Sequence, residues 1–256
     1  MKEFSELVEI IKKLRSPEGC PWDREQTPDS LIPFMIEEVY EVIDALDHRN
    51  DRDLVKELGD VMLHVVFQAV LAEEDNRFTV RDVLRHINHK MISRHPHVFS
   101  NRIFDSEEEI HSYWEKKKKT EGRKRLLDGI PNELPSLHKA YRVQSKASMV
   151  GFDWDKVHDV WEKIREEVQE LEEASLDKNP ESMEMEFGDL LFSLVNIGRF
   201  LGINADEALR KSTDKFIRRF HRVEAMAEEN NTDLRSLSLD ELETLWQKAK
   251  KEEEKE

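Results

Sequence analysis

The acidic stretch EEVYE occupies residues 37–41 and is followed by ELGD at residues 57–60. The same pair recurs as EEVQE at residues 166–170 and EFGD at residues 186–189, with an identical interval between the two motifs. A single acidic pentapeptide carries little information in a chain of 256 residues that contains 56 Asp and Glu. Five acids and a glycine repeated at one spacing do carry information, and they indicate an internal duplication.

Other features recur in the same order in both halves: a Trp-Asp pair, a Lys and an Arg four residues apart, and a late Trp. Their defining members are Trp22 and Trp154, Lys90 and Lys215, Arg94 and Arg219, and Trp114 and Trp246. The acids are offset by 129 residues between the copies, whereas the Trp-Asp pairs are offset by 132. The duplication predicts two domains, residues 1–119 and 136–256, each long enough to bury a core. Residues 120–135, with two glycines and two prolines, form the predicted linker.

The composition favours a helical protein. Only 8 Gly and 8 Pro occur in the chain, and 38% of the residues are charged, so we expect an all-α fold. The net charge of −16 argues against a nucleic acid polymer as a partner. A single cysteine excludes an internal disulfide, and no segment resembles a signal peptide or a membrane span. We therefore expect a cytoplasmic protein that does not bind a membrane.

Apolar residues recur at helical spacing through most of the chain. The helices predicted in the first half cover residues 3–14, 29–48, 51–75, 79–94 and 106–119. Those predicted in the second half cover residues 136–149, 155–176, 180–201, 204–229 and 238–252. Asp51 and Asn179 are expected N-caps, Pro180 a first helical residue and Gly202 a C-terminal stop. The pattern predicts two tandem helical bundles.

The spacing of the repeated acids brings carboxylates onto one face of each helix. Glu38 and Glu41 are three residues apart on one predicted helix, and Glu57 and Asp60 on the next. Residue 49 is the midpoint between these pairs, so an antiparallel hairpin that turns there would bring them together. The same relation holds in the second half about residue 178. Four carboxylates are therefore expected to converge in each half: Glu38, Glu41, Glu57 and Asp60, and then Glu167, Glu170, Glu186 and Asp189.

Converging carboxylates repel one another, by roughly 3 kcal/mol for a pair about 5 Å apart at an effective dielectric constant near 20. Protonation or a hard divalent cation relieves this repulsion, and oxygen ligands without a nearby His or Cys favour Mg²⁺ or Mn²⁺. The alternative is that the acids are solvated surface residues. Gly59 and Gly188 favour a site, because a glycine inside a helix costs ~1 kcal/mol and requires a close-packing reason.

The basic pairs and the tryptophans have two interpretations each. Lys90 with Arg94, and Lys215 with Arg219, could clamp phosphate oxygens from one helix face, or could be ordinary surface cations. The late tryptophans could stack on a nucleobase or anchor a core. We expect the earlier pair, Trp22 and Trp154, to be packing residues at the start of helices.

Together these motifs resemble the MazG family of nucleoside triphosphate pyrophosphohydrolases, within the all-α NTP pyrophosphatase superfamily, over nearly the whole chain. The motifs are CPWDREQT (20–27), EEVYE, ELGD, RHPHVF (94–99), VGFDW (150–154), EEVQE and EFGD. The resemblance implies that the eight converging acids bind metal. It also implies nucleotide contacts at Lys163, Ile164, Arg165, Glu166, Glu167, Ser182, Met183, Glu184, Met185, Asp189, Lys215, Phe216, Ile217, Arg218, Arg219 and Trp246, with Lys90, Arg94 and Trp114 in the corresponding places of the first half.

The implied reaction is the Mg²⁺-dependent hydrolysis of a nucleoside triphosphate to a nucleoside monophosphate and pyrophosphate. In that reaction Lys215 and Arg219 would take the triphosphate charge, Trp246 would stack on the base, and Glu166 would help to orient the attacking water or a metal-bound ligand. The resemblance also implies a homodimer. Two alternatives remain open: a regulator that acts on an alarmone nucleotide such as ppGpp, and a metal-stabilised helical interaction module without catalysis. The residues do not indicate the preferred base or sugar.

Overall fold

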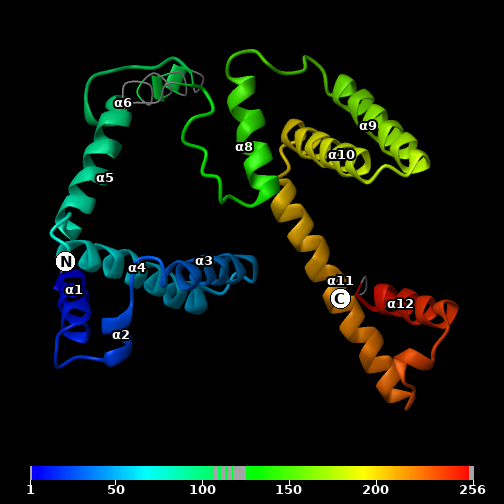
Figure 1. The fold of residues 1–256 in the computed structure, drawn as a ribbon, viewed down its shortest axis with the longest axis horizontal. Helices are drawn as coiled ribbons and strands as arrows, with labels where there is room; N and C mark the ends of the chain where they lie inside the picture. Colours follow the sequence, from blue (N-terminus) through cyan, green and yellow to red (C-terminus); the bar gives the residue numbers. More distant parts are fainter. Residues whose placement is uncertain (1, 107–108, 111–112, 115–116, 118–124, 254–256) are drawn as a thin grey trace. The chain divides into compact units, whose positions relative to one another are not determined.

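The computed structural model describes every residue except 1, 107–108, 111–112, 115–116, 118–124 and 254–256. The chain divides into two compact units, residues 1–118 and 119–256. Both units are built from helices (Figure 1), and no strand occurs in the part of the chain that the structure describes. The prediction of an all-α fold is confirmed.

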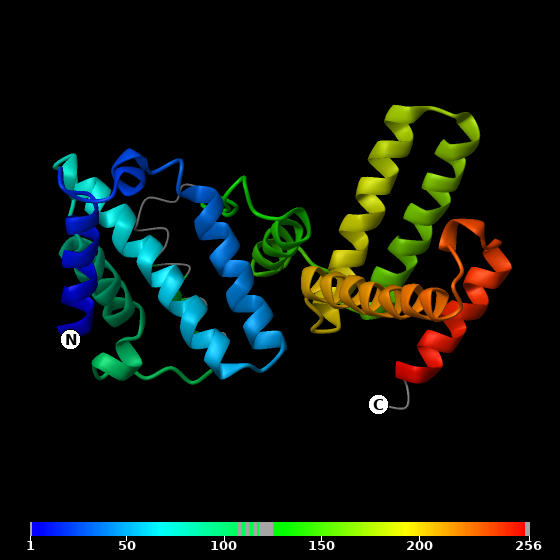
Figure 2. The ribbon, with the colours of Figure 1, turned by 90° about the horizontal axis from the view of Figure 1, so that it is seen from below.

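The first unit is organised around a helical hairpin. Its helices are α1 (Lys2–Leu14), α2 (Pro21–Glu25), α3 (Ile32–Asp47), α4 (Asp51–Glu74), α5 (Val80–Arg94) and α6 (Pro96–Phe99). Helices α3 and α4 lie side by side (Figures 1 and 2), and α1 and α5 contact α4. The core lies between α1 and the second half of α4, where Ile11, Val66, Phe67 and Val70 are buried together with Leu31.

The second unit contains the corresponding hairpin. Its helices are α8 (Ser136–Ser148), α9 (Val157–Asp177), α10 (Pro180–Phe200), α11 (Ala205–Glu229), the 3₁₀ helix η1 (Leu234–Ser236) and α12 (Leu239–Glu253). Helices α9 and α10 lie side by side (Figures 1 and 2), α8 contacts α10 and α11, and α12 contacts α11. Val160, Ile164 and Ile197 are buried between α9 and α10, whereas Val223 and Met226 belong to a separate core between α11 and α12.

Both hairpins turn at the residues that the acidic spacing predicts. Arg49 and Lys178 have φ angles of 51° and 53°, the left-handed conformation that ends one helix and lets the chain reverse. Asn179 is the N-cap of α10, as predicted, but α4 is capped by Asn50 and not by Asp51. The Asn50 side chain accepts hydrogen bonds from two backbone N–H groups of the first turn, and Asp51 is the first helical residue.

The predicted helices agree with the observed ones to within a few residues. In the predicted helix 106–119, residue 106 is not helical, residues 109, 110, 113, 114 and 117 are helical, and the others lie outside the described residues. Helices α2, α6 and η1 were not predicted, because a helix of three to five residues is too short to show an apolar period. None of the helices in the described residues is long and apolar enough to cross a membrane.

One packing expectation is wrong, and another holds only in part. A Cβ atom added at Gly59 or Gly188 would have no neighbour within 4 Å, so these glycines do not serve close packing within the described chain. Trp22 lies at the start of α2 and its ring packs edge-on against Phe34, but about half of Trp22 and of Trp154 is exposed, so neither is a core residue. The two glycines thus face open space, and the two tryptophans lie partly at the surface.

Candidate active site

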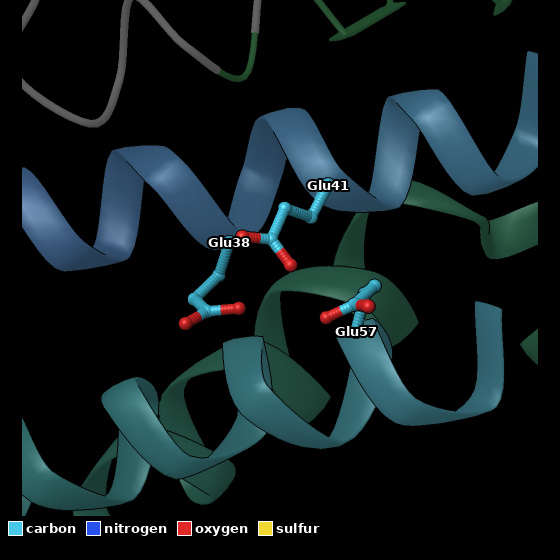
Figure 3. Close-up of side chains that lie close together, drawn as sticks. All are labelled: Glu38, Glu41 and Glu57. Carbon is cyan, nitrogen blue, oxygen red and sulfur yellow. The ribbon is translucent and has the colours of Figure 1, made fainter. Parts of the chain in front are cut away.

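The first carboxylate cluster lies between α3 and α4. Oxygen atoms of Glu38, Glu41 and Glu57 lie within 4.8 Å of one another, and Figure 3 shows the three side chains pointing toward one another. Asp60, the fourth predicted member, is not in this group, but its charge contributes to the raised pKa of Glu38, after burial as the main cause. The hairpin thus brings three of the four predicted carboxylates together and keeps Asp60 within electrostatic reach.

The second carboxylate cluster lies between α9 and α10 and has a different membership. Glu167, Glu186 and Asp189 each offer an oxygen atom within 4.8 Å of the others. Glu170 lies outside this group, although it stands where Glu41 stands in the first half. Burial raises the pKa of Glu170, and the neighbouring charges of Glu167 and Glu186 raise it further. The structure therefore brings a different three of the four predicted acids together in each half.

The burial of two of these acids favours a bound cation, rather than water alone, as the group that compensates their charge. Glu57 and Glu167 are only 6% and 4% exposed, which is costly for a carboxylate unless its charge is compensated. The Oε2 atom of Glu57 is buried and has no hydrogen-bond partner in the described part of the chain. An all-oxygen set with an unsatisfied buried acceptor fits a hard divalent cation.

A lysine contacts each carboxylate cluster, and the two lysines come from different places in the repeat. Lys56 on α4 lies 2.9 Å from Glu57 and 3.9 Å from Glu41, measured from Nζ to the nearest carboxylate oxygen. In the second half the cation is Lys163 on α9, at 2.8 Å from Glu167 and 2.9 Å from Glu166. Hydrogen bonds to these glutamates raise the pKa of Lys163, which keeps it charged at neutral pH. Sequence reasoning missed Lys56, whose only signal is its position next to Glu57.

The raised carboxylate pKa values predict how stability responds to pH and metal. Glu38, Glu41 and Glu170 all have pKa values raised above the ordinary 4.5, so the folded state binds their protons more tightly than the unfolded state does. Their contribution to stability is present below 4.5 and is lost as the pH rises through the raised values. We expect Mg²⁺ to raise the melting temperature more at about pH 8 than at about pH 5, because metal competes with protons. Equal shifts at both pH values in a thermal scan would contradict this.

The predicted phosphate clamp of the second half lies on α11, together with Trp246 from α12. Arg219 donates to Glu253 at 2.5 Å, and Arg218 donates to the same carboxylate at 3.1 Å. These bonds lower the pKa of Glu253. The Trp246 ring lies 5.0 Å from that of Phe216 and within 6.0 Å of the Arg219 guanidinium. These residues form a cluster with one another on a helix pair other than the one that carries the carboxylates, and Lys215 is exposed beside them.

The corresponding residues of the first half have a similar relation. The indole nitrogen of Trp114 donates to the backbone oxygen of Arg94 at 2.6 Å, and its ring packs edge-on against His95 at 5.4 Å. Lys90 is half-buried one turn earlier on α5. In both halves the late tryptophan thus packs against the helix segment that carries the basic pair.

The contacts of Trp246 predict a measurable role in stability. Because Trp246 packs against the core formed by Val223, Met226 and Ala249, we expect Trp246→Ala to destabilise the protein by about 2 kcal/mol in chemical denaturation. The Michaelis constant for nucleotides, measured on the same variant, tests the predicted base stacking. A similar increase for every base with unchanged stability would support stacking and contradict the anchoring role.

The remaining residues expected to contact nucleotide lie close to the second carboxylate cluster in sequence and fold. Residues 163–167 lie on α9, and residues 182–185 lie in the first turns of α10, just before Glu186. Beside this cluster is a cavity of about 340 Å³ lined by Lys163, Glu167 and Asp189 among others. Sequence reasoning predicted those three residues and named Trp154 only as a packing residue. The other neutral residues of the cavity belong to no motif that it singled out: Val160, Phe192, Ser193 and Asn196.

The fold and the sites define a class of protein: an all-α protein with duplicated carboxylate clusters that fit divalent cations, with basic side chains nearby. A family profile described as MazG nucleotide pyrophosphohydrolase domain matches residues 26–99 and 156–224. The chain therefore belongs to the MazG family and contains two copies of the domain that defines this family. This confirms the family and the tandem arrangement that the sequence predicts.

Individual relatives agree with this assignment. The chain is 49% identical over 250 residues to a nucleoside triphosphate pyrophosphohydrolase/pyrophosphatase MazG of Thermotoga maritima, covering 96% of this chain and 95% of that protein. It is 38% identical to a nucleoside triphosphate pyrophosphohydrolase of Escherichia coli K12, covering 99% of each. It is also 44% identical to the uncharacterised protein YabN of Bacillus subtilis, covering 98% of this chain and 52% of that protein.

Proposed function

We propose that this protein hydrolyses nucleoside triphosphates to nucleoside monophosphates and pyrophosphate, and that the second carboxylate cluster is the principal site. The observation that carries this proposal is the cavity lined by Glu167, Asp189 and Lys163. It combines acids that fit a cation with a positively charged side chain that can bind phosphate. The names of the relatives in Thermotoga maritima and Escherichia coli describe this same activity. Nucleotide-pool housekeeping is the role that such an activity suggests.

The acids would hold Mg²⁺, with Mn²⁺ as the alternative. When bound, the cation supplies charge neutralisation for phosphate oxygens and a more acidic water. Glu167, Glu186 and Asp189 would hold it in the second half, with Glu170 in electrostatic reach. The corresponding acids of the first half form a second place for a cation. Near-complete burial of Glu167 keeps its carboxylate in one position, since it contacts Lys163 on one side and its cluster partners on the other.

The other residues position the substrate and the water. Lys163 is charged, lies at the cavity and can exchange its glutamate partners for phosphate oxygens. Glu166, held by Lys163 at 2.9 Å, is exposed enough to accept a proton from a water that attacks the α-phosphorus. Lys215 and Arg219 would neutralise the departing pyrophosphate, which requires Arg219 to release Glu253. This assignment therefore predicts that the ion pair between Arg219 and Glu253 breaks when a nucleotide binds.

A homodimer is part of the proposal. Leu58, Gly59 and Met62 share one face of α4, and Phe187, Gly188 and Leu191 share the corresponding face of α10. The four apolar side chains are exposed, and both glycines face open space. Another helix could approach closely at each glycine, so a second copy would bury these two stripes. Light scattering measures the mass of the assembly directly.

Product analysis tests the proposed reaction. Purified protein is incubated with each NTP and dNTP in the presence of Mg²⁺, and the products are separated by ion-exchange chromatography. We expect nucleoside monophosphate and pyrophosphate in equal amounts, and no reaction after chelation of the metal. Release of diphosphate and inorganic phosphate would contradict the proposed bond cleavage. Cleavage of ppGpp but not of any NTP would favour the alarmone alternative, and no cleavage of either would favour an interaction module.

A further inference from the structure

A group of arginines and glutamates lies between α11 and α12, two helices that contact each other (Figure 1) and that do not carry the carboxylate clusters. Arg218, Arg219 and Arg222 of α11 line a cavity of about 200 Å³ together with Glu252 and Glu253 of α12. That volume is several times the roughly 30 Å³ that one water molecule occupies in the liquid. Three guanidinium groups around such a space form a place for an anion.

The anions that these arginines bind in the structure are carboxylates of the same chain. Glu253 accepts hydrogen bonds from Arg219 at 2.5 Å and from Arg218 at 3.1 Å. Glu252 accepts from Arg222 at 2.6 Å. The arginines are therefore already paired, and a phosphate chain can bind them only if these carboxylates leave.

The two glutamates lie where a helix disfavours negative charge. Glu252 and Glu253 are the last two described residues of α12, and the carbonyl end of a helix carries a partial negative charge. Lys250 and Lys251, in the same turn, are the residue type that this end favours. The end of α12 does not stabilise the two carboxylates, so the arginines of α11 are the groups that hold them.

Most of these ion pairs are open to solvent. The side chains of Glu253 and Glu252 are 31% and 51% exposed, and those of Arg218 and Arg222 are 64% and 40% exposed. Exposed ion pairs contribute little to stability and are screened by dissolved ions. Arg219 is the exception, with 16% of its side chain exposed. A competing anion can therefore open these pairs without unfolding the helices.

The attachment of α12 to α11 does not depend on the ion pairs. Val223, Met226 and Ala249 are buried together between the two helices, and Leu245 and Trp246 pack against them. The last turn of α12 can therefore release the arginines while the remainder of the helix stays in place.

A phosphate chain is a better ligand for these arginines than a carboxylate. A guanidinium group binds phosphate oxygens through two parallel N–H bonds, and a triphosphate presents several such oxygens in a row. Arg218 and Arg219 are among the residues that the sequence predicts to contact nucleotide, whereas Arg222 is not. The carboxylates thus occupy groups that a substrate needs.

The first half lacks most of this arrangement. Ser93 and His97 stand where the second half has Arg218 and Arg222, at the same offset of 125 residues that relates the two basic pairs. At these three positions the first half retains only the guanidinium group of Arg94. The set of three is therefore specific to the second half, which is the half proposed to contain the principal site.

We propose that the last turn of α12 is an internal competitor for phosphate: the carboxylates of Glu252 and Glu253 occupy the arginines until a polyphosphate chain displaces them. The inference rests on the proposed function and adds a regulatory contact at the same site. Such a competitor lowers the apparent affinity for every polyphosphate ligand by the fraction of time that the arginines are free. It thereby sets the substrate concentration at which hydrolysis begins, and it favours departure of the pyrophosphate product.

The variant Glu252→Gln/Glu253→Gln tests the competitor, because it removes both charges and keeps the size of the side chains. The matched control is Glu228→Gln/Glu243→Gln, which removes two exposed charges from the same helix pair outside the cavity. Calorimetry with Mg²⁺ measures the affinity of each protein for tripolyphosphate, for pyrophosphate and for α,β-imido-NTPs, which are not cleaved at the proposed bond.

We expect Glu252→Gln/Glu253→Gln to bind all three ligands about 10-fold more tightly than the wild type, the effect of arginines that are free about a tenth of the time. The control should change each affinity by less than about twofold. Unchanged or weaker binding in Glu252→Gln/Glu253→Gln would overturn the proposal, since the glutamates would then only position the arginines or fasten the helices. Tighter binding of the imido-NTPs alone would overturn it as well, because a competitor for phosphate affects all three ligands.

Hydrogen exchange of the wild-type protein gives a second readout that needs no variant. Exchange in the last turn of α12 is compared with and without tripolyphosphate. We expect it to become at least about twofold faster when tripolyphosphate binds, because that turn loses its partners, while residues 242–249 stay protected. Slower or unchanged exchange in the last turn would contradict the displacement.

These experiments distinguish the two levels of inference. If Glu252→Gln/Glu253→Gln binds polyphosphate more tightly but the wild type cleaves no NTP, the proposed function fails and the internal competitor stands. If the wild type cleaves NTPs and the variant has the same affinities and the same Michaelis constant, the function stands and the internal competitor is overturned.

Discussion

Glu167→Gln and Glu186→Gln are each expected to lower the rate of NTP hydrolysis at least about 100-fold, because each removes a carboxylate charge from the second cluster. Glutamine keeps the size of the side chain and one oxygen atom but lacks the negative charge that a divalent cation requires. For Glu167 the change also weakens one of the two glutamate contacts of Lys163, so the lysine is held less firmly. Initial rates of pyrophosphate release at saturating Mg²⁺ measure the effect.

Glu172→Gln is the matched control for this prediction. Glu172 is an exposed acid on the same helix, outside the carboxylate cluster, and its substitution removes the same charge without removing a ligand. We expect it to retain activity within about twofold, as for an ordinary surface substitution. Rates near the wild-type value in both Glu167→Gln and Glu186→Gln would show that these acids are dispensable or that the first half carries the activity.

The second large effect should appear when the two halves are compared. We expect the double variant Glu167→Gln/Glu170→Gln to lose most NTP hydrolysis, and Glu38→Gln/Glu41→Gln to keep most of it. Both halves contain a carboxylate cluster, so both should bind Mg²⁺. They differ in the space beside the cluster, where Phe67 is packed in the first half and Asn196 lines a cavity in the second. The first half should therefore act more slowly or on a different phosphate substrate.

Circular dichroism of both double variants controls for loss of helical structure. Mn²⁺ binding, followed by electron paramagnetic resonance, should show about half of the wild-type sites in each, since each variant removes one cluster. If the first-half variant loses most NTP activity and the second-half variant keeps it, the assignment of the principal site is reversed.

The organisation of the chain could be predicted from sequence because its signals are local or repetitive. Helix bounds follow from apolar periodicity, and the hairpin turns at Arg49 and Lys178 follow from the symmetric spacing of the acids about them. Helices of three to five residues could not be predicted, because they are too short to show an apolar period. The cap at Asn50 was placed one residue late, because Asn and Asp are equally good caps and occur side by side.

The sequence by itself therefore determined the duplication, the all-α fold, the helical hairpins and the eight acids, four in each half, from which the two clusters are drawn. Only the tertiary structure decided which three acids converge in each half, since that depends on the rotation of one helix against the other. It also decided that Lys56 forms an ion pair with one cluster and Lys163 with the other. A cavity lined by Gln144 and Asn196 depends on side chains from segments about 50 residues apart, whose packing no local period encodes. The same interval of the repeat is thus a filled core in one half and an open cavity in the other.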